Sequence, residues 1–213
     1  MIFSNRKEAG AKLAHHLIRY RGGKDTIVLG LPRGGVPVAF EVANALGVSL
    51  DVFVVRKVGA PYNEEFAMGA VAQDGGLYID SSVVDMLRVS EEALHKLIEK
   101  KNKEVKERVS RFRGGRPPLE LSEKTVILVD DGVATGSTMK AAIKVLNSMR
   151  LKTLVVAVPV APPSTIRELK EMADEVICLY QDEGFMAVGQ YYIDFGQVED
   201  SEVIAILDGY HQK

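Results

Sequence analysis

The chain has 213 residues, of which 46% are hydrophobic and 26% are charged, and its formal net charge is −2. This length fits a single domain with a substantial core, and the balance of apolar and charged residues argues against extensive disorder. The nearly neutral charge indicates no general affinity for nucleic acid or for a membrane surface, so we expect a small molecule as the ligand.

The N-terminal residues and the cysteine content favour a cytoplasmic protein. Charges at Arg6, Lys7 and Glu8 fall where a signal peptide needs its apolar stretch. The longest apolar run, residues 154–163, contains prolines and is well short of the ~20 residues that span a bilayer. Cys178 is the single cysteine, so an intrachain disulfide is excluded, and its apolar neighbours predict a core position. We therefore expect no membrane anchor and a reducing compartment.

The first part of the chain predicts helices and buried strands in alternation. The expected elements are a helix over 6–20, a strand over 26–31, a helix over 35–46, a continuous strand over 50–55, and a hairpin with strands at 67–72 and 77–80. Glycines separate these elements: Gly22 and Gly23 follow the first helix, Gly47 is placed to end the second, and Gly75 lies in the hairpin turn.

The second part continues the alternation and indicates the fold class. A long helical stretch is expected over 82–112, with a break near Ser90 as a possible N-cap. Then follow a strand over 125–129, a helix over 137–149, a strand over 153–158, a helix over 164–172, a strand over 175–179 and a helix near 200–209. Continuous apolar strands alternating with amphipathic helices predict an α/β fold with a mostly parallel sheet and helices on both faces.

Ligands of such sheets bind at the carboxyl ends of the strands, and the strand over 126–129 ends in Asp130 and Asp131. The residues that follow are Gly132, Val133, Ala134, Thr135, Gly136, Ser137 and Thr138. Adjacent carboxylates repel each other, a cost that cations or hydroxyl donors offset. The small residues let backbone N–H groups converge on an anion at the start of the next helix, and the three hydroxyls add donors. A sugar phosphate would bind both parts of this segment, its hydroxyls at the two carboxylates and its phosphate at the loop. The alternative is an N-capped turn with two solvated aspartates.

Residues 126–138, V-I-L-V-D-D-G-V-A-T-G-S-T, closely resemble the signature of type I phosphoribosyltransferases. The resemblance implies that fold, with a small hood from the C-terminal and N-terminal segments, and transfer of ribose 5-phosphate from 5-phosphoribosyl-1-pyrophosphate to a nitrogenous base. It implies that Asp130 and Asp131 are catalytic, holding the ribose hydroxyls directly or through Mg²⁺, and that 132–138 binds the 5′-phosphate. Some proteins with this signature have lost catalysis, so a regulator that binds the same compound is the alternative.

The segment Arg33-Gly34-Gly35 follows the first strand and feeds a helix. Its glycines let the backbone approach an anion, and Arg33 offers a forked cation suited to phosphate. It resembles the pyrophosphate loop of the same family, which implies pyrophosphate binding by these residues and a catalytic role for Arg33. By the same resemblance Arg56 and Lys57 are candidates for pyrophosphate contact, the alternative being exposed basic residues beside a loop. Residues 58–66 are expected to form a mobile connection.

Aromatic residues concentrate near the C-terminus, where Phe185, Tyr191 and Tyr192 are the candidates for contact with a base. Aromatic faces stack on flat heterocycles, so the segment 180–213 is a candidate hood over a nucleobase. Purine salvage members of the family have a loosely similar run, but the lysine that they place after the preceding strand is absent. A packed aromatic cluster that joins the core to the terminus is the alternative interpretation.

Within a single domain of residues 1–213, the stretch 84–116 is expected to be a helical insertion. It carries more Lys and Arg than Asp and Glu, but most of these bases fall outside its apolar stripe, which favours a solvated amphipathic helix. Near its end, Arg111, Arg113 and Arg116 are within possible reach of a phosphate. The expected partners are 5-phosphoribosyl-1-pyrophosphate and a small nitrogenous acceptor whose identity the sequence does not indicate, and the resemblance allows a homodimer.

Overall fold

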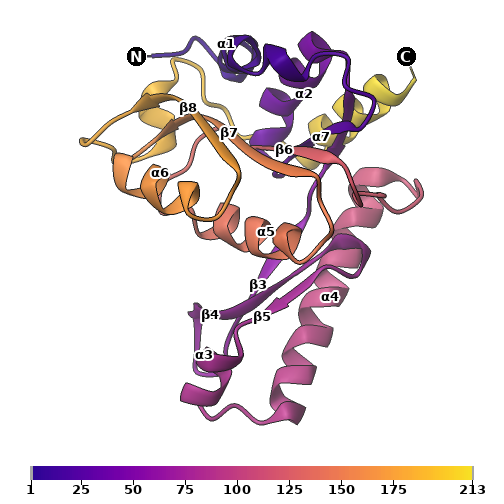
Figure 1. Ribbon diagram of the computed structural model, residues 1–213, viewed down its shortest axis with the longest axis vertical. Helices are drawn as coiled ribbons and strands as arrows, with labels where there is room; N and C mark the ends of the chain where they lie inside the picture. The colour runs from indigo at the N-terminus through magenta and orange to yellow at the C-terminus, as the bar shows by residue number, and fades with distance from the viewer. Residues whose placement is uncertain (1, 213) are drawn as a thin grey trace.

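The computed structural model describes residues 2–212 and shows a five-stranded sheet between helices, with a small second sheet beside a long helix (Figure 1). The helices are α1 Arg6–His16, α2 Gly35–Leu46, α3 Ser81–Met86, α4 Glu91–Arg113, α5 Ser137–Asn147, α6 Pro163–Lys170 and α7 Asp200–His211. The strands are β1 Thr26–Gly30, β2 Ser49–Val52, β3 Val55–Ala60, β4 Asn63–Ala72, β5 Leu77–Ile79, β6 Thr125–Val129, β7 Thr153–Ala161 and β8 Glu175–Gln181. Short 3-10 helices lie at Ile18–Tyr20, Gln73–Gly75 and Val188–Tyr191.

The large sheet has the strand order β2-β1-β6-β7-β8, and each neighbouring pair is parallel. Gly30 at the end of β1 pairs with Val129 at the end of β6. Because both strands run in the same direction and end at the same level, the loops that leave them lie side by side at the carboxyl edge of the sheet. This register places the segment Arg33-Gly34-Gly35 next to the segment that begins at Asp130.

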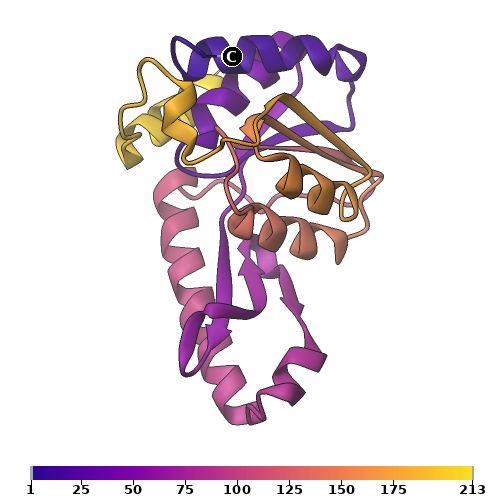
Figure 2. The ribbon, with the colours of Figure 1, turned by 90° about the vertical axis from the view of Figure 1, so that its left-hand side faces the viewer.

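Two apolar cores lie on opposite faces of the large sheet, since successive strand residues point to opposite sides. Val28 and Ile127 belong to the core that includes side chains of α1, α2, α4 and α7. Leu29 and Leu128 belong to the core that includes side chains of α5 and α6. Figures 1 and 2 show these helices on the two sides of the sheet. The predicted α/β fold, with a mostly parallel sheet covered on both faces, is confirmed.

The small sheet, β3-β4-β5, is antiparallel and differs from the expectation in two respects. The predicted continuous strand 50–55 is wrong, because the Phe53 N–H donates to the Gly30 carbonyl and the Val54 N–H donates to the Gln73 side chain, which redirects the chain out of the large sheet. The connection predicted over 58–66 is also wrong in its secondary structure, since most of it lies in the paired strands β3 and β4. The predicted hairpin of β4 with β5 is confirmed.

Helices α3 and α4 flank the small sheet, and α4 runs along its length (Figure 2). The predicted break near Ser90 is confirmed, since the Ser90 Oγ accepts a hydrogen bond of 3.3 Å from the Ala93 N–H and so caps α4. At the other end of α4, Arg113 forms a buried salt bridge of 3.2 Å with Asp51 of β2, and both side chains are 4% exposed. No helix within residues 2–212 is long and apolar enough to cross a membrane.

The N-terminal segment meets the segment after β8 in an aromatic cluster that includes side chains of β7 and β8. Phe3 pairs with Tyr192 in an isolated parallel bridge, and the Phe3 N–H donates to the Tyr191 carbonyl at 2.7 Å. Phe3 and Val160 are fully buried in this cluster. Cys178 of β8 is half-buried against the core that includes α5 and α6, and burial raises the pKa of its thiol to about 11. The N-terminal segment is thus joined to residues 191–193, which belong to the other segment predicted to build the hood.

Candidate functional site

The two glycine-containing loops touch each other at the carboxyl edge of β1 and β6. A Cβ atom on Gly35 would lie 2.6 Å from the Val129 carbonyl oxygen and 2.8 Å from the Asp130 Cα. A Cβ atom on Gly34 would overlap the carboxylate of Asp131. Only glycine permits so close an approach of backbone to neighbouring atoms. The peptide bond between Pro32 and Arg33, at the start of this loop, is cis.

Asp130 and Asp131 form an electrostatically costly pair. The Asp131 N–H donates to the Asp130 Oδ1 at 2.9 Å. Burial, followed by the charge of Asp131, raises the pKa of the Asp130 carboxyl well above its usual value. Burial also raises the pKa of Asp131, against the opposing effect of Arg6. A pair of buried carboxylates that resists full ionisation is a place where a bound cation or a set of hydroxyl donors is stabilising.

Arg6 is the charged partner of this pair and is a residue that the sequence did not point to. Its Nε lies 2.8 Å from the Asp131 Oδ2, and both side chains are 13% exposed. Its Nη1 donates to the Gly196 carbonyl at 2.8 Å, and its guanidinium stacks 4.0 Å from the ring centre of Phe195. Arg6 stands at the start of α1, 125 residues before Asp131, in no motif that would indicate the contact.

The loop over 132–138 runs into α5 and lines a cavity of about 260 Å³ together with Asp130, Met139 and Val188. Three bonds hold its backbone in place. The Val133 N–H donates to the Val160 carbonyl at 2.9 Å, the Thr165 hydroxyl donates to the Ala134 carbonyl at 2.7 Å, and the Lys140 ammonium donates to the Thr135 carbonyl at 2.8 Å. A fixed, small-residue loop at the start of a helix suits an anion such as phosphate.

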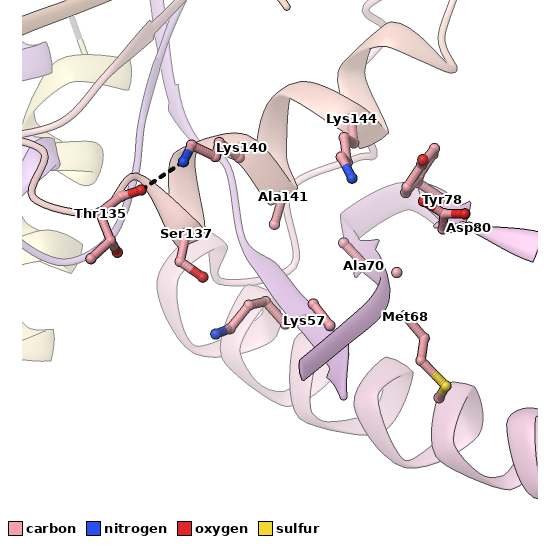
Figure 3. A pocket seen from close by; sticks show the side chains of 12 residues that line it. Lys57, Met68, Ala70, Tyr78, Asp80, Thr135, Ser137, Lys140, Ala141 and Lys144 are labelled. Atoms are coloured by element: carbon pink, nitrogen blue, oxygen red, sulfur yellow. Dashed lines mark hydrogen bonds between the residues drawn. The ribbon is translucent and has the colours of Figure 1, made fainter. Parts of the chain in front are cut away.

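A second hollow of about 260 Å³ lies between α5 and the small sheet (Figure 3). Thr135 and Ser137 line it, so it adjoins the loop over 132–138, and Lys57 of β3 lines it from the opposite side. Arg56, the preceding residue, lies with its Nε 3.7 Å from Glu104 of α4. Neighbouring strand residues point to opposite faces, so Arg56 and Lys57, both expected to contact pyrophosphate, lie on different sides of β3.

Arg33 faces the start of α7 rather than a deep cavity. Its Nη1 lies 3.7 Å from Glu199 and 3.8 Å from Asp200, distances too long for hydrogen bonds. Of the three arginines expected to be within reach of a phosphate, Arg111 forms a salt bridge of 2.7 Å with Asp200. The other two already have partners elsewhere: Arg113 pairs with Asp51 of β2, and Arg116 donates to the carbonyls of Phe112 and Arg113 and lies 3.5 Å from Asp208 of α7.

The candidate base-binding aromatics pack against other aromatic side chains. Tyr191 and Tyr192 are 3% and 6% exposed. The ring of Tyr192 stacks on Phe195 at 4.9 Å, and Phe185 stacks on Tyr191 at 5.3 Å. The Tyr192 hydroxyl donates to the backbone carbonyl of Asp131 at 2.6 Å, and burial raises its pKa, so it remains a donor. Tyr192 therefore connects the aromatic cluster to the acidic pair, and contact of these residues with a base stays a prediction.

Within residues 2–212, no group of three or more His, Cys, Asp and Glu side chains gathers to hold a metal ion. The Asp130 and Asp131 pair offers carboxylate oxygens at a site where positive charge would be stabilising. Mg²⁺ commonly binds through one or two carboxylates and completes its shell with substrate phosphates and water. The two carboxylates therefore fit a Mg²⁺ ion that arrives with a phosphorylated ligand.

The sequence matches the family described as phosphoribosyl transferase domain over residues 2–195. Two proteins of Mycobacterium tuberculosis, "Putative phosphoribosyl transferase MT0597" of strain CDC 1551 and "Putative phosphoribosyl transferase Rv0571c" of strain H37Rv, are each 43% identical over 211 residues. The match covers 99% of this chain and 47% of each relative, so the chain spans about half their length. The crystal structure of TT1426 from Thermus thermophilus is 45% identical, covers 99% of both chains and superposes with a TM-score of 0.88.

Proposed function

The chain belongs to the phosphoribosyl transferase domain family, and from that premise we propose that it transfers ribose 5-phosphate from 5-phosphoribosyl-1-pyrophosphate to a small nitrogenous base and releases pyrophosphate. One observation carries the proposal: the carboxylates at the end of β6 lie against the Arg33-Gly34-Gly35 loop and continue into the loop over 132–138. Groups suited to a hydroxylated sugar, a phosphate and a pyrophosphate are thus contiguous at one sheet edge.

The sugar phosphate would bind along the end of β6. The carboxylates of Asp130 and Asp131 accept hydrogen bonds from the ribose hydroxyls, which adds donors to those that Arg6 and the Asp131 N–H already supply. The backbone N–H groups of 132–138, with the hydroxyls of Thr135, Ser137 and Thr138, bind the 5′-phosphate at the start of α5. Lys57 lies across the hollow from this loop and adds positive charge on its side (Figure 3).

The pyrophosphate would bind at the neighbouring loop. Gly34 and Gly35 let the backbone approach the acidic pair, and the guanidinium of Arg33 supplies a forked cation. In this proposal Arg56, near the start of β3, adds a second guanidinium to the pyrophosphate. A Mg²⁺ ion held by Asp130 and Asp131 would neutralise charge on the leaving pyrophosphate. The donors and cations of the chain stabilise the same charge without rearranging during the reaction.

The chain's own share of the reaction is chiefly positioning. Fixing the sugar and the acceptor base in line contributes up to about 7–11 kcal/mol to the lowering of a barrier. The carboxylates beside the ribose also stabilise positive charge that develops on the sugar as pyrophosphate departs. In this proposal the whole of residues 1–213 is one transferase domain in the cytoplasm, 84–116 is an insertion, and 180–213 covers the base, with Phe185, Tyr191 and Tyr192 on its side of the site.

The proposal is tested by measuring pyrophosphate release from 5-phosphoribosyl-1-pyrophosphate and Mg²⁺ in the presence of a panel of nucleobases and related heterocycles. We expect release with at least one acceptor, and a loss of about a hundredfold or more in Arg33→Met, because removing a cation from a transition-state contact costs several kcal/mol. Arg150→Met, at an exposed loop position, is the matched control and should retain the wild-type rate.

Tight binding of the activated sugar without release for any acceptor would replace the transferase proposal by the regulator that the sequence left open. Absence of both binding and release would contradict both functions. The same assay, with the responding acceptor, identifies the class of base. Size-exclusion chromatography with light scattering then tests whether the chain forms the homodimer that the resemblance allows.

A further inference from the structure

Arg108 of α4 is a half-buried arginine for which no acidic side chain lies within salt-bridge distance among the described residues. Its guanidinium lies 5.4 Å from the ring centre of Phe112. Burial lowers the pKa of Arg108, and the nearby charges of Arg56, Arg33 and Arg111 lower it further, while Asp200 opposes them. The Arg108 guanidinium therefore lies near three other arginines, and the negative charge of Asp200 only partly balances their positive charge.

The position of Arg108 on α4 explains why it points inward. Val105 and Phe112 are buried in the core, and Arg108 lies three residues after the first and four residues before the second. Residues at these spacings share one face of a helix, so the apolar face that packs α4 onto the molecule also carries Arg108. Helix α4 contacts β3 and α7, the elements that hold Arg56 and Asp200. Two other bases of α4 are also largely buried, but each has a close acidic partner: Lys101 pairs with Glu104 at 3.0 Å and Arg113 with Asp51 at 3.2 Å.

The acidic residues around this cluster are few, and most of their pairs are loose. Arg33 lies 3.7 Å from Glu199 and 3.8 Å from Asp200, and Arg56 lies 3.7 Å from Glu104. Glu104 also pairs with Lys101 at 3.0 Å, and Asp200 pairs more closely with Arg111 at 2.7 Å. The cluster therefore has more positive than negative groups, and its arginines are free to exchange these contacts for a stronger anion.

We propose that Arg108 binds the pyrophosphate group of 5-phosphoribosyl-1-pyrophosphate, joining Arg33 and Arg56 as the third arginine of that subsite. Three elements supply the three side chains: the loop after β1, the start of β3, and the inward face of α4. Guanidinium groups bind phosphate oxygens through paired hydrogen bonds, and a highly charged anion offsets the cost of gathering them. The inference rests on the proposed function, and it gives the α4 insertion a part in substrate binding.

The experiment compares binding of three ligands, each with Mg²⁺, to the full-length wild type and to Arg108→Met. The ligands are 5-phosphoribosyl-1-pyrophosphate, inorganic pyrophosphate and ribose 5-phosphate. We expect Arg108→Met to weaken both pyrophosphate-bearing ligands about tenfold or more, since a hydrogen bond to a charged group is lost, and to change ribose 5-phosphate binding less than about twofold. Arg108→Lys keeps the charge but not the fork, and should give an intermediate affinity.

Lys103→Met is the matched control, because Lys103 is exposed on the same helix, and it should leave all three affinities unchanged. Thermal unfolding of each variant verifies that it is folded. Wild-type affinity of Arg108→Met for pyrophosphate and 5-phosphoribosyl-1-pyrophosphate would overturn this inference while leaving the proposed function standing. An equal loss for ribose 5-phosphate would also overturn it, because the effect would then not be specific to the pyrophosphate. Failure of the wild type to bind any of the ligands would instead overturn the proposed function itself.

Discussion

Asp130 is the residue at which stability and binding oppose each other most directly. It is half-buried beside the buried carboxylate of Asp131, and the pKa of its carboxyl lies well above the usual 3.8 because burial and the charge of Asp131 disfavour ionisation. Between 3.8 and the raised value, the folded protein retains a proton that the unfolded chain has released. Stability therefore falls as the pH rises through this window, since the unfolded state binds fewer protons there.

This cost predicts that Asp130→Asn is more stable than the wild type at neutral pH. The amide oxygen can still accept the bond from the Asp131 N–H, while the buried charge is gone. A gain on the order of 1 kcal/mol corresponds to a rise of about 2–4 °C in the melting temperature of a domain of this size. The difference should shrink as the pH is lowered toward about 4, because the wild-type carboxyl then becomes protonated.

Thermal unfolding of both proteins, scanned from about pH 4 to about pH 8, checks the prediction. A variant that is no more stable than the wild type at neutral pH, or a difference that does not depend on pH, would show that the buried carboxylate is not the source of the cost. Binding of the activated sugar should be lost in the same variant, because an amide cannot replace a charged acceptor for ribose hydroxyls or Mg²⁺.

At the scale of elements, the loop after β1 is shaped by its contact with the end of β6. Gly35→Ala would place a methyl group 2.6 Å from the Val129 carbonyl and 2.8 Å from the Asp130 Cα, and both of these are backbone atoms that cannot swing away. We expect a decrease of about 1–3 kcal/mol in the free energy of unfolding, the usual cost of forcing atoms into a packed space. Urea denaturation measures it.

Gly209→Ala is the matched control for this substitution. Gly209 lies within α7, and nothing surrounds the position of its missing Cβ within 4 Å. Alanine favours a helix more than glycine does, so this variant should gain about 0.5–1 kcal/mol. If the two alanine variants shifted stability in the same direction by similar amounts, the tight contact of the two loops would not be what requires glycine at position 35.

The buried salt bridge between Arg113 and Asp51 links the end of helix α4 to β2 of the large sheet. Arg113→Met would leave the Asp51 carboxylate buried and without its cation, and should lower the free energy of unfolding by about 3–5 kcal/mol. Arg113 also donates to the Pro117 carbonyl at 2.5 Å, so the loop after α4 would lose a contact as well. Urea denaturation at constant pH is the measurement.

Combining Arg113→Met with Asp51→Asn should recover part of this loss, since the double variant has no unpaired buried charge. A double variant whose loss equals the sum of the two single losses would contradict a direct interaction of the two side chains. The salt bridge matters for the further inference too, because it holds the end of α4 on which the inward position of Arg108 depends.

For the whole molecule, the order of elements and the fold class could be predicted because the apolar residues follow regular spacings. The helix over 35–46 and the strand over 125–129 were expected at the residues where the structure has them, and Gly47 has the left-handed conformation, with φ of 63°, that ends a helix. The positions of the two loops could also be predicted together, since β1 and β6 end at the same edge of a parallel sheet.

The long-range contacts between side chains could not be predicted from the sequence. Arg6 meets Asp131 from the other end of the fold, and neither its charge nor its position marks it. Asp51 sits within an apolar run, and its partner Arg113 follows 62 residues later. The end of β3 and the first residues of β4 were expected to be a connection over 58–66, because Pro61 and the polar residues around it resemble one, whereas pairing between the two strands satisfies the backbone. Because β3 was not expected to extend over these residues, the sequence also did not predict that Arg56 and Lys57 point to opposite faces of it.

The central claim is that the carboxyl edge of β6 binds an activated sugar phosphate, and calorimetric titration of 5-phosphoribosyl-1-pyrophosphate with Mg²⁺ into the folded protein tests it most directly. We predict saturable binding to the wild type, and an affinity lower by about tenfold or more in Asp131→Asn, because a charged acceptor is lost at the sugar. The exposed Asp85→Asn, on α3, should bind as the wild type does. No detectable binding to the wild type, or equal affinity in Asp131→Asn, would contradict the claim.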